Sequence, residues 1–427
     1  MKTFLSLLVA LLFAAGVLPA RAQTPADFQQ MANRFRTLYN AKQSDSLYSL
    51  YSPQMATALP PDKTAQLLDQ LHIQLGMLQT IQLSHQEKSY ASYKATFEKT
   101  IVTMTLAVDS AKHLSGFHFL PYQPETPAAP VNGESSILQL ETSTGTLSGT
   151  LVIPPGHSKL PVVLIIAGSG PTDRDGNSPM LGLHSDMYKL LADSLSRHGI
   201  ASLRYDKRGV GASTAAMSSE ASLTFASYID DAVGYLALLR ADPRFSKVIV
   251  LGHSEGSLVG MVASENGKAD AYISAAGAGD RIDKVLLPQL AVQSPPLADS
   301  ARILFDSLAK GQSVHVEQGP LLVFFRASIQ PYMISWLRYN PQTEIKKLHI
   351  PVLIIQGSTD LQTTVGDAEK MKAAKPDATL KIITGMNHIF RQVGADRQPN
   401  IATYNDPSLP LQPEVVSDIV AFLLTLH

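Results

Sequence analysis

Residues 248–257 read VIVLGHSEGS, and this segment decides the fold of the chain. The aliphatic run at 248–251 is followed at once by the pentapeptide Gly-His-Ser-Glu-Gly. This order is typical of a buried strand that turns sharply into a helix, with Ser254 at the turn. Glycines on both sides of the serine are needed because Cβ atoms there would collide with the neighbouring strand and helix. The segment therefore predicts a nucleophile elbow, which exposes the Ser254 hydroxyl above a sheet.

Short apolar runs with β-branched residues recur on both sides of this segment and alternate with amphipathic helical patterns. The runs cover residues 162–166, 200–205, 248–251, 272–274, 352–355 and 380–383. Runs of this kind are typical of a mostly parallel sheet that is buried on both faces. The sequence therefore predicts a doubly wound α/β architecture.

A serine hydroxyl becomes nucleophilic only when a base removes its proton and a carboxylate orients that base. Among the histidines after Ser254, only His388 follows the last predicted buried strand and lies in a loop rich in turn residues. Among the carboxylates between these two residues, only Asp360 follows a buried strand within a few residues. The chain order Ser, Asp, His is the one expected after a nucleophile elbow. We therefore predict a catalytic triad of Ser254, Asp360 and His388.

Five segments resemble, in their order along the chain, the serine esterases and serine aminopeptidases of the α/β-hydrolase superfamily. They are GSGPTDRDGN at 168–177, RYDKRGVGAS at 204–213, GHSEGS at 252–257, QGSTD at 356–360 and GMNH at 385–388. The resemblance covers residues 138–427 and implies an α/β-hydrolase fold with the same triad.

An oxyanion hole needs two backbone N–H donors. The start of the helix after the elbow supplies the N–H of Glu255, and the glycine-rich loop after the run at 162–166 should supply the other. The resemblance implies Ser169 as this second donor. Because Ala167-Gly168 stands where the family usually has a His-Gly dipeptide, Gly170 remains an alternative to Ser169.

The first residues predict an export signal, with Lys2 before an apolar stretch at 4–18 and Ala20-Arg21-Ala22 as the cleavage site. The stretch is shorter than the roughly 18–20 residues that a spanning helix needs. We expect cleavage after Ala22 and a soluble, exported protein in the periplasm or outside the cell. The chain has no cysteine, which excludes a disulfide framework. No later segment predicts a membrane span.

Two domains are expected after this signal. Helical spacing at 28–39 and 67–78, followed by strand alternation at 102–108, predicts a small α+β domain over residues 23–120. This domain resembles those that precede the hydrolase in some exported bacterial hydrolases. A proline-rich linker is predicted at 121–137, and a hydrolase domain at 138–427. A helical cap is predicted as an insertion at about 280–347, where the strand pattern lapses and aromatic residues accumulate.

Several other functions are excluded by composition and motif spacing. The chain has 35 Lys and Arg against 36 Asp and Glu, so its charge favours no nucleic-acid partner. The Asp-x-Asp-Gly at 173–176 lacks the acidic residues that a calcium loop requires at positions 171 and 182, and predicts a salt-bridged loop instead. The two Gly-x-Gly segments lack the third glycine of a dinucleotide site. We therefore expect neither a cofactor nor a metal.

These patterns predict a serine hydrolase that cleaves carboxylic esters of small or short-chain acyl groups through an acyl-enzyme. Its partner would be a small-molecule acyl substrate, and the sequence does not indicate an oligomeric state. A serine aminopeptidase-type peptidase on the same triad is an alternative. A second alternative is an exported ligand-binding protein whose hydrolase domain is silent.

Overall fold

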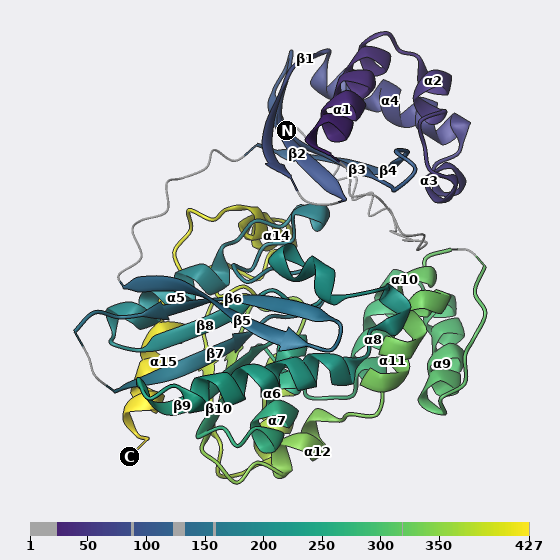
Figure 1. Ribbon diagram of the computed structural model, residues 1–427. Coiled ribbons are helices and arrows are strands. Elements are labelled where there is room, and N and C mark those ends of the chain that lie inside the picture. Colours follow the sequence, from purple (N-terminus) through teal and green to yellow (C-terminus); the bar gives the residue numbers. More distant parts are fainter. Residues whose placement is uncertain (1–23, 87–88, 123–132, 157–158, 318, 427) are drawn as a thin grey trace. The chain divides into compact units, whose positions relative to one another are not determined.

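The computed structural model describes residues 24–86, 89–122, 133–156, 159–317 and 319–426 (Figure 1). The predicted export signal at 1–22 and most of the predicted linker lie outside the described residues. The chain divides into two compact units. The first comprises Met1–Glu125 and Pro179–Leu183, and the second comprises Thr126–Ser178 and His184–His427.

The first unit has helices followed by an antiparallel sheet, the predicted α+β order. The helices are α1 (Pro25–Asn40), α2 (Ser44–Tyr48), α3 (Pro53–Ala58) and α4 (Pro61–Leu75). The strands β1 (Leu78–Gln86), β2 (Tyr90–Phe97), β3 (Ile101–Val108) and β4 (Leu114–Pro121) pair in that order. Aromatic rings fill its core, as where Phe35 meets Phe117 edge to face with centroids 5.2 Å apart. These rings pack against one another because the helices bury one apolar face against the sheet.

The second unit is built on an eight-stranded sheet of order β12-β11-β10-β9-β7-β8-β6-β5. Its strands are β5 (Glu134–Thr142), β6 (Gly145–Ile153), β7 (Leu160–Ile166), β8 (Ala201–Tyr205), β9 (Phe245–His253), β10 (Ala271–Ala275), β11 (Val352–Gly357) and β12 (Thr379–Ile383). The strands from β7 to β12 are parallel where they pair, which confirms the predicted α/β-hydrolase type of sheet.

The hairpin of β5 and β6 adds two antiparallel strands that the buried-run pattern did not predict. β5 is mostly exposed, so its residues carry no continuous apolar run. As a result the sheet begins at Glu134, inside the predicted linker and before the predicted boundary at residue 138.

Helices cover both faces of this sheet. Val162 and Leu164 of β7 join a core with α6 (Phe225–Ala241), α7 (Glu255–Asn266) and α13 (Val365–Ala374). Val163 and Ile165 point to the opposite face, where they join α5 (Met187–Arg197) and α15 (Pro413–Leu424). This alternation arises because successive strand residues point to opposite faces, and it requires apolar residues at every position of β7. Figure 1 shows the helices on the two sides of the strands.

Among the described residues between β10 and β11, where the cap was predicted, lie five helices. They are α8 (Ile282–Gln293), α9 (Pro295–Ala309), α10 (Leu322–Phe325), α11 (Gln330–Trp336) and α12 (Pro341–Lys346). Phe325 packs on Phe305 within this insertion, and Trp336 stacks on Phe225 of α6 with centroids 5.4 Å apart. The remaining short elements are α14 (Arg397–Ala402) and the 3₁₀ turns at Pro179–Leu181, Gly211–Ala216, Glu220–Ser222, Ala327–Ile329 and Thr403–Asn405. None of the helices in the described ranges is long and apolar enough to cross a membrane.

Buried ion pairs join the loops that follow β7 and β8. The Arg174 guanidinium donates to Asp206 Oδ2 at 2.7 Å, and the backbone N–H of Arg174 donates to Asp206 Oδ1 at 2.8 Å. Asp206 also accepts the N–H of Ala212, while Asp175 accepts from Arg204 Nε at 2.7 Å. The segment at 173–176 is therefore a salt-bridged loop, as its sequence predicts. These contacts align the carboxyl ends of the two strands.

Replacing Arg174 should lower the free energy of unfolding because it leaves the buried Asp206 carboxylate without its cationic partner. The side chains of Arg174 and Asp206 are 12% and 5% exposed. We expect Arg174→Met to lower the free energy of unfolding by about 3 kcal/mol, measured by urea denaturation. The control Arg244→Met breaks the more exposed pair with Asp242 and should cost less than about 1 kcal/mol. Equal losses in the two variants would contradict this account.

Candidate active site

Ser254 lies at the turn between β9 and α7, where the elbow was predicted. Its φ of 55° and ψ of −120° place it in a backbone conformation that non-glycine residues rarely adopt. Its N–H donates to the carbonyl oxygen of Ala275 on the neighbouring strand at 3.0 Å, which holds the strained turn. Serine is a favoured N-cap residue, yet the Ser254 side chain makes no capping hydrogen bond to α7. The Ser254 hydroxyl is therefore not used to cap the helix.

Three glycines allow the chain to pack closely around Ser254. A Cβ on Gly252 would lie 2.1 Å from the carbonyl oxygen of Gly256, and one on Gly256 would lie 2.4 Å from that of Ile166. A Cβ on Gly168 would lie 3.1 Å from the Cβ of Ser254. The loop after β7 therefore comes against the elbow, and the two glycines of the pentapeptide are sterically required.

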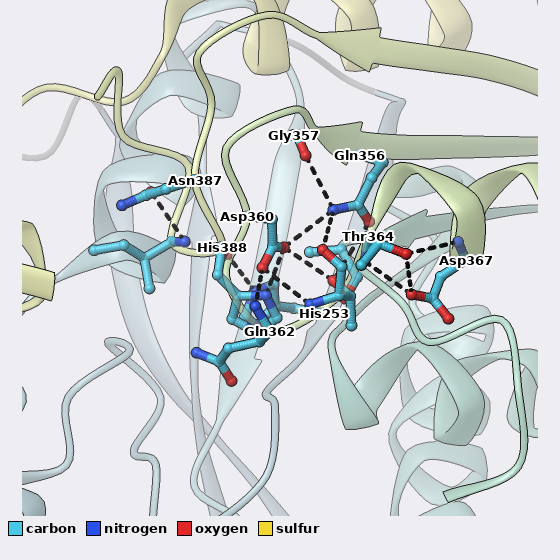
Figure 2. Close-up of polar contacts among 12 residues, drawn as sticks. His253, Gln356, Gly357, Asp360, Gln362, Thr364, Asp367, Asn387 and His388 are labelled. Atoms are coloured by element: carbon cyan, nitrogen blue, oxygen red, sulfur yellow. Dashed lines mark hydrogen bonds and ion pairs between the residues drawn. The ribbon is translucent and has the colours of Figure 1, made fainter. Parts of the chain in front are cut away.

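The structure brings Asp360 and His388 together from the loops after β11 and β12 (Figure 2). Asp360 Oδ2 lies 2.7 Å from His388 Nδ1, and both side chains are buried. Asp360 also accepts the N–H groups of Gln362 at 2.7 Å and Thr363 at 3.1 Å, the Thr363 hydroxyl at 2.9 Å and Gln356 Nε2 at 3.1 Å. Burial raises the pKa of Asp360, but His388 and the backbone N–H groups of Gln362 and Thr363 outweigh it and lower the pKa to about 2.

An ionised carboxylate only accepts hydrogen bonds, so the proton of the Asp360–His388 contact belongs to His388 Nδ1. This tautomer leaves Nε2 as the basic nitrogen of His388, which is the arrangement that a general base for Ser254 requires. The ring centroids of His388 and His253 lie 4.8 Å apart, and His253 is the residue immediately before Ser254.

His253 connects the elbow to its surroundings in a way that sequence reasoning missed. Its Nε2–H donates to the carbonyl oxygen of His388 at 2.8 Å, and its Nδ1 accepts from the Tyr188 hydroxyl at 2.7 Å. That hydroxyl in turn accepts the N–H of Gly168 at 2.9 Å. Burial, followed by the nearby His388, lowers the pKa of His253 to about 3, so the ring is neutral at physiological pH. His253 stands inside the quoted pentapeptide, whereas nothing in the sequence around Tyr188 signals this contact.

The two residues predicted as oxyanion donors lie in chain segments next to the elbow. Glu255 begins α7 directly after Ser254, and Ser169 lies in the exposed part of the loop that Gly168 brings against the elbow. The N–H of Gly168 is occupied by Tyr188, so the next amide along the loop is that of Ser169. The Gly170 amide follows in the same exposed stretch, and Ser169 and Glu255 remain predicted donors.

Asp173, in the acidic loop at 173–176, binds the backbone of its own loop. Asp173 Oδ1 accepts the N–H groups of Asp175 and Asn177 at 2.9 and 2.8 Å, and burial raises the pKa of Asp173 to about 7. Within the part of the chain that the structure describes, no group of three or more His, Asp or Glu side chains is placed to hold a metal ion.

The chain is similar in sequence to known hydrolases. Residues 181–391 match the family model described as serine aminopeptidase, S33. Esterase EstD of Thermotoga maritima is 25% identical over 377 residues, which cover 85% of this chain and 88% of that protein. The chain is a serine hydrolase with the α/β-hydrolase fold. Residues 32–117, in the first unit of this α/β-hydrolase, match a family model of unknown function, DUF3887.

Two solved structures are similar to a large part of this chain. Est1E from Butyrivibrio proteoclasticus, with ferulic acid bound, is 16% identical with a TM-score of 0.46 and covers 68% of this chain and 98% of that chain. The Pyrococcus furiosus esterase Pf2001 is also 16% identical with a TM-score of 0.46, over 71% of this chain and 95% of that chain.

The low pKa of His253 predicts a loss of stability in acid. Unfolded histidine takes up a proton near pH 6.5, whereas folded His253 does so only near pH 3, so the unfolded state binds more protons between these values. Its contribution to the free energy of unfolding should fall by about 2 kcal/mol from pH 7.5 to pH 5. Urea denaturation of the wild type and His253→Gln at both pH values measures this difference.

His253→Gln should therefore show a smaller loss of stability on acidification than the wild type. The control His315→Gln, at a side chain 85% exposed, should keep the dependence of the wild type. The explanation fails if the His253 variant loses as much stability in acid as the wild type does.

Proposed function

We propose that this chain hydrolyses carboxylic esters of small or short-chain acyl groups with Ser254 as nucleophile. The observation that carries the proposal is the buried Asp360–His388 pair, whose His388 ring lies against His253, the residue before a strained serine whose hydroxyl caps no helix. A base with a fixed tautomer next to such a serine is the arrangement of acyl-transfer hydrolases.

The reaction follows from these positions. Ser254 Oγ attacks the acyl carbon as its proton passes to His388 Nε2, and Asp360 stabilises the imidazolium. The backbone N–H groups of Ser169 and Glu255 stabilise the oxyanion. When the tetrahedral intermediate collapses, the imidazolium protonates the leaving alcohol and the acyl group stays on Ser254. A water molecule then attacks the acyl-enzyme as its proton passes to His388. When this second intermediate collapses, His388 returns the proton to Ser254 Oγ and the carboxylic acid is released.

The charges around the site favour esters over peptides with a free amino terminus. An aminopeptidase needs a carboxylate free to bind the substrate ammonium group. Glu255, next to the nucleophile, is buried and paired with Lys207 at 3.6 Å. Glu220 is likewise paired with Arg326 of the cap. The name of the Thermotoga maritima relative, an esterase, also supports this choice.

Bulky side chains support a small acyl group. The rings of Tyr228 and Tyr332 are buried 5.8 Å apart between centroids, and the nearby Glu255 carboxylate adds to burial in raising the pKa of both hydroxyls. Both rings lie near Glu255, the residue after Ser254, and in this proposal they limit the length of the acyl group.

Turnover of paired substrates tests the proposal. The wild type should hydrolyse p-nitrophenyl acetate and butyrate well, p-nitrophenyl laurate poorly, and an aminoacyl p-nitroanilide hardly at all. Ser254→Ala should lower kcat by at least about 10⁴-fold and abolish labelling by a fluorophosphonate probe. Ser300→Ala, which removes an exposed serine of α9, should behave as the wild type.

Other outcomes would favour the alternatives. Persistent labelling of Ser254→Ala would exclude Ser254 as the nucleophile. Faster turnover of the anilide than of the esters would indicate a peptidase on the same triad. A wild type that retains a ligand but neither reacts with the probe nor hydrolyses any ester would be the binding protein with a silent hydrolase domain.

We also propose that the chain is exported and that residues 1–22 are removed. The support is the sequence itself, with a lysine, an apolar stretch and Ala-Arg-Ala in the order of an export signal. Mass spectrometry of the protein from expressing cells should find a chain beginning at Gln23 outside the cytoplasm. An uncleaved chain that stays in the cytoplasm would contradict the proposal.

A further inference from the structure

Lys207 is a buried charged group that the proposed triad does not use. It follows β8, and its side chain is 3% exposed. Its ammonium group donates to the carbonyl oxygen of Gly168 and lies 3.6 Å from the Glu255 carboxylate, which is 4% exposed. The ring of Tyr228 lies 5.0 Å from Nζ. Burying an ammonium group is costly, so its three contacts indicate a specific purpose.

The contact to Gly168 acts on the predicted oxyanion donor. The carbonyl group of Gly168 and the N–H of Ser169 belong to one peptide group, which is planar and trans. The N–H therefore points away from the carbonyl oxygen that Lys207 holds. The preceding peptide is also fixed, because the N–H of Gly168 donates to Tyr188 at 2.9 Å. Because hydrogen bonds hold both peptide planes, the direction of the Ser169 N–H is fixed.

The contact to Glu255 acts on the other donor. Glu255 contributes its backbone N–H from the first residue of α7, and its side chain reaches Lys207. One ammonium group thus joins the two chain segments that carry the two predicted donors. A cation on a peptide oxygen also withdraws electrons from that peptide and strengthens its N–H as a donor. In a buried site this adds to the stabilisation of developing negative charge.

We propose that Lys207 is a positioning residue of the oxyanion hole, which links the Gly168–Ser169 peptide to Glu255 and holds both backbone donors in place. The inference rests on the proposed function, because it requires an oxyanion at Ser254. A purely structural reading is that Lys207 only neutralises the buried Glu255 carboxylate. The two readings differ in what happens when both charges are removed together.

The test compares Lys207→Met with the double variant Lys207→Met/Glu255→Gln. The single variant leaves a lone buried carboxylate, so it should lose thermal stability. The double variant buries no unpaired charge and keeps the Glu255 backbone N–H, so its stability should recover. If Lys207 positions the donors, the double variant should still show kcat for p-nitrophenyl acetate reduced by about 10²-fold, with KM little changed. A boronic acid that mimics the tetrahedral intermediate should bind more weakly by a similar factor.

A control uses another lysine with a buried side chain, although its carboxylate partner is exposed. Lys375 is 9% exposed on its side chain and contacts Asp377 at 2.8 Å, just before β12 begins. Because β9 and β12 run in the same direction, this pair lies at the opposite edge of the sheet from Ser254. Lys375→Met/Asp377→Asn should leave kcat unchanged.

The outcomes separate this inference from the proposed function. If the wild type hydrolyses p-nitrophenyl acetate, Ser254→Ala does not, and the double variant regains kcat together with stability, then Lys207 only neutralises Glu255 and the inference is wrong. If the wild type neither hydrolyses an ester nor reacts with a fluorophosphonate, the proposed function fails and the inference fails with it.

Discussion

The close approach of β7, β9 and α7 around Ser254 is the constraint on which the site depends. Only hydrogen atoms fit at Gly252 and Gly256, where a Cβ would lie 2.1 and 2.4 Å from backbone carbonyl oxygens. This crowding forces the strained conformation of Ser254, because strand and helix must reverse direction within one residue. The same close packing holds the loop after β7 against Ser254. The positions of the proposed nucleophile and of the predicted oxyanion donors therefore depend on the same packing.

Two sets of buried contacts hold this arrangement, one between neutral groups and one between charged groups. The neutral part runs from the Gly168 amide through Tyr188 and His253 to the backbone of His388, and ties the loop after β7 to the loop that carries the base. The charged part is Lys207, which ties the same loop to Glu255. Each polar atom in these contacts is shielded from water, so breaking one leaves an uncompensated partner.

Most of the parallel sheet could be predicted because strands buried on both faces need apolar residues at successive positions, as in the run at 162–166. The hairpin at 134–153 escaped because β5 is largely exposed and lies at the edge of the sheet. Asp360 and His388 could be selected because each follows a strand of the recognised pattern. Tyr188 could not, since a tyrosine in an amphipathic helix looks the same whether its hydroxyl meets water or a histidine.

The sequence by itself determined the α/β architecture, the elbow at Ser254 and the choice of Asp360 and His388, because local patterns of apolar runs, glycines and chain order encode them. Only the tertiary structure decided which groups support these residues, and in particular that Lys207 holds the peptide after Gly168 and Tyr188 holds the peptide before it. These contacts join residues from separate loops and helices, and their formation depends on packing that no local pattern records.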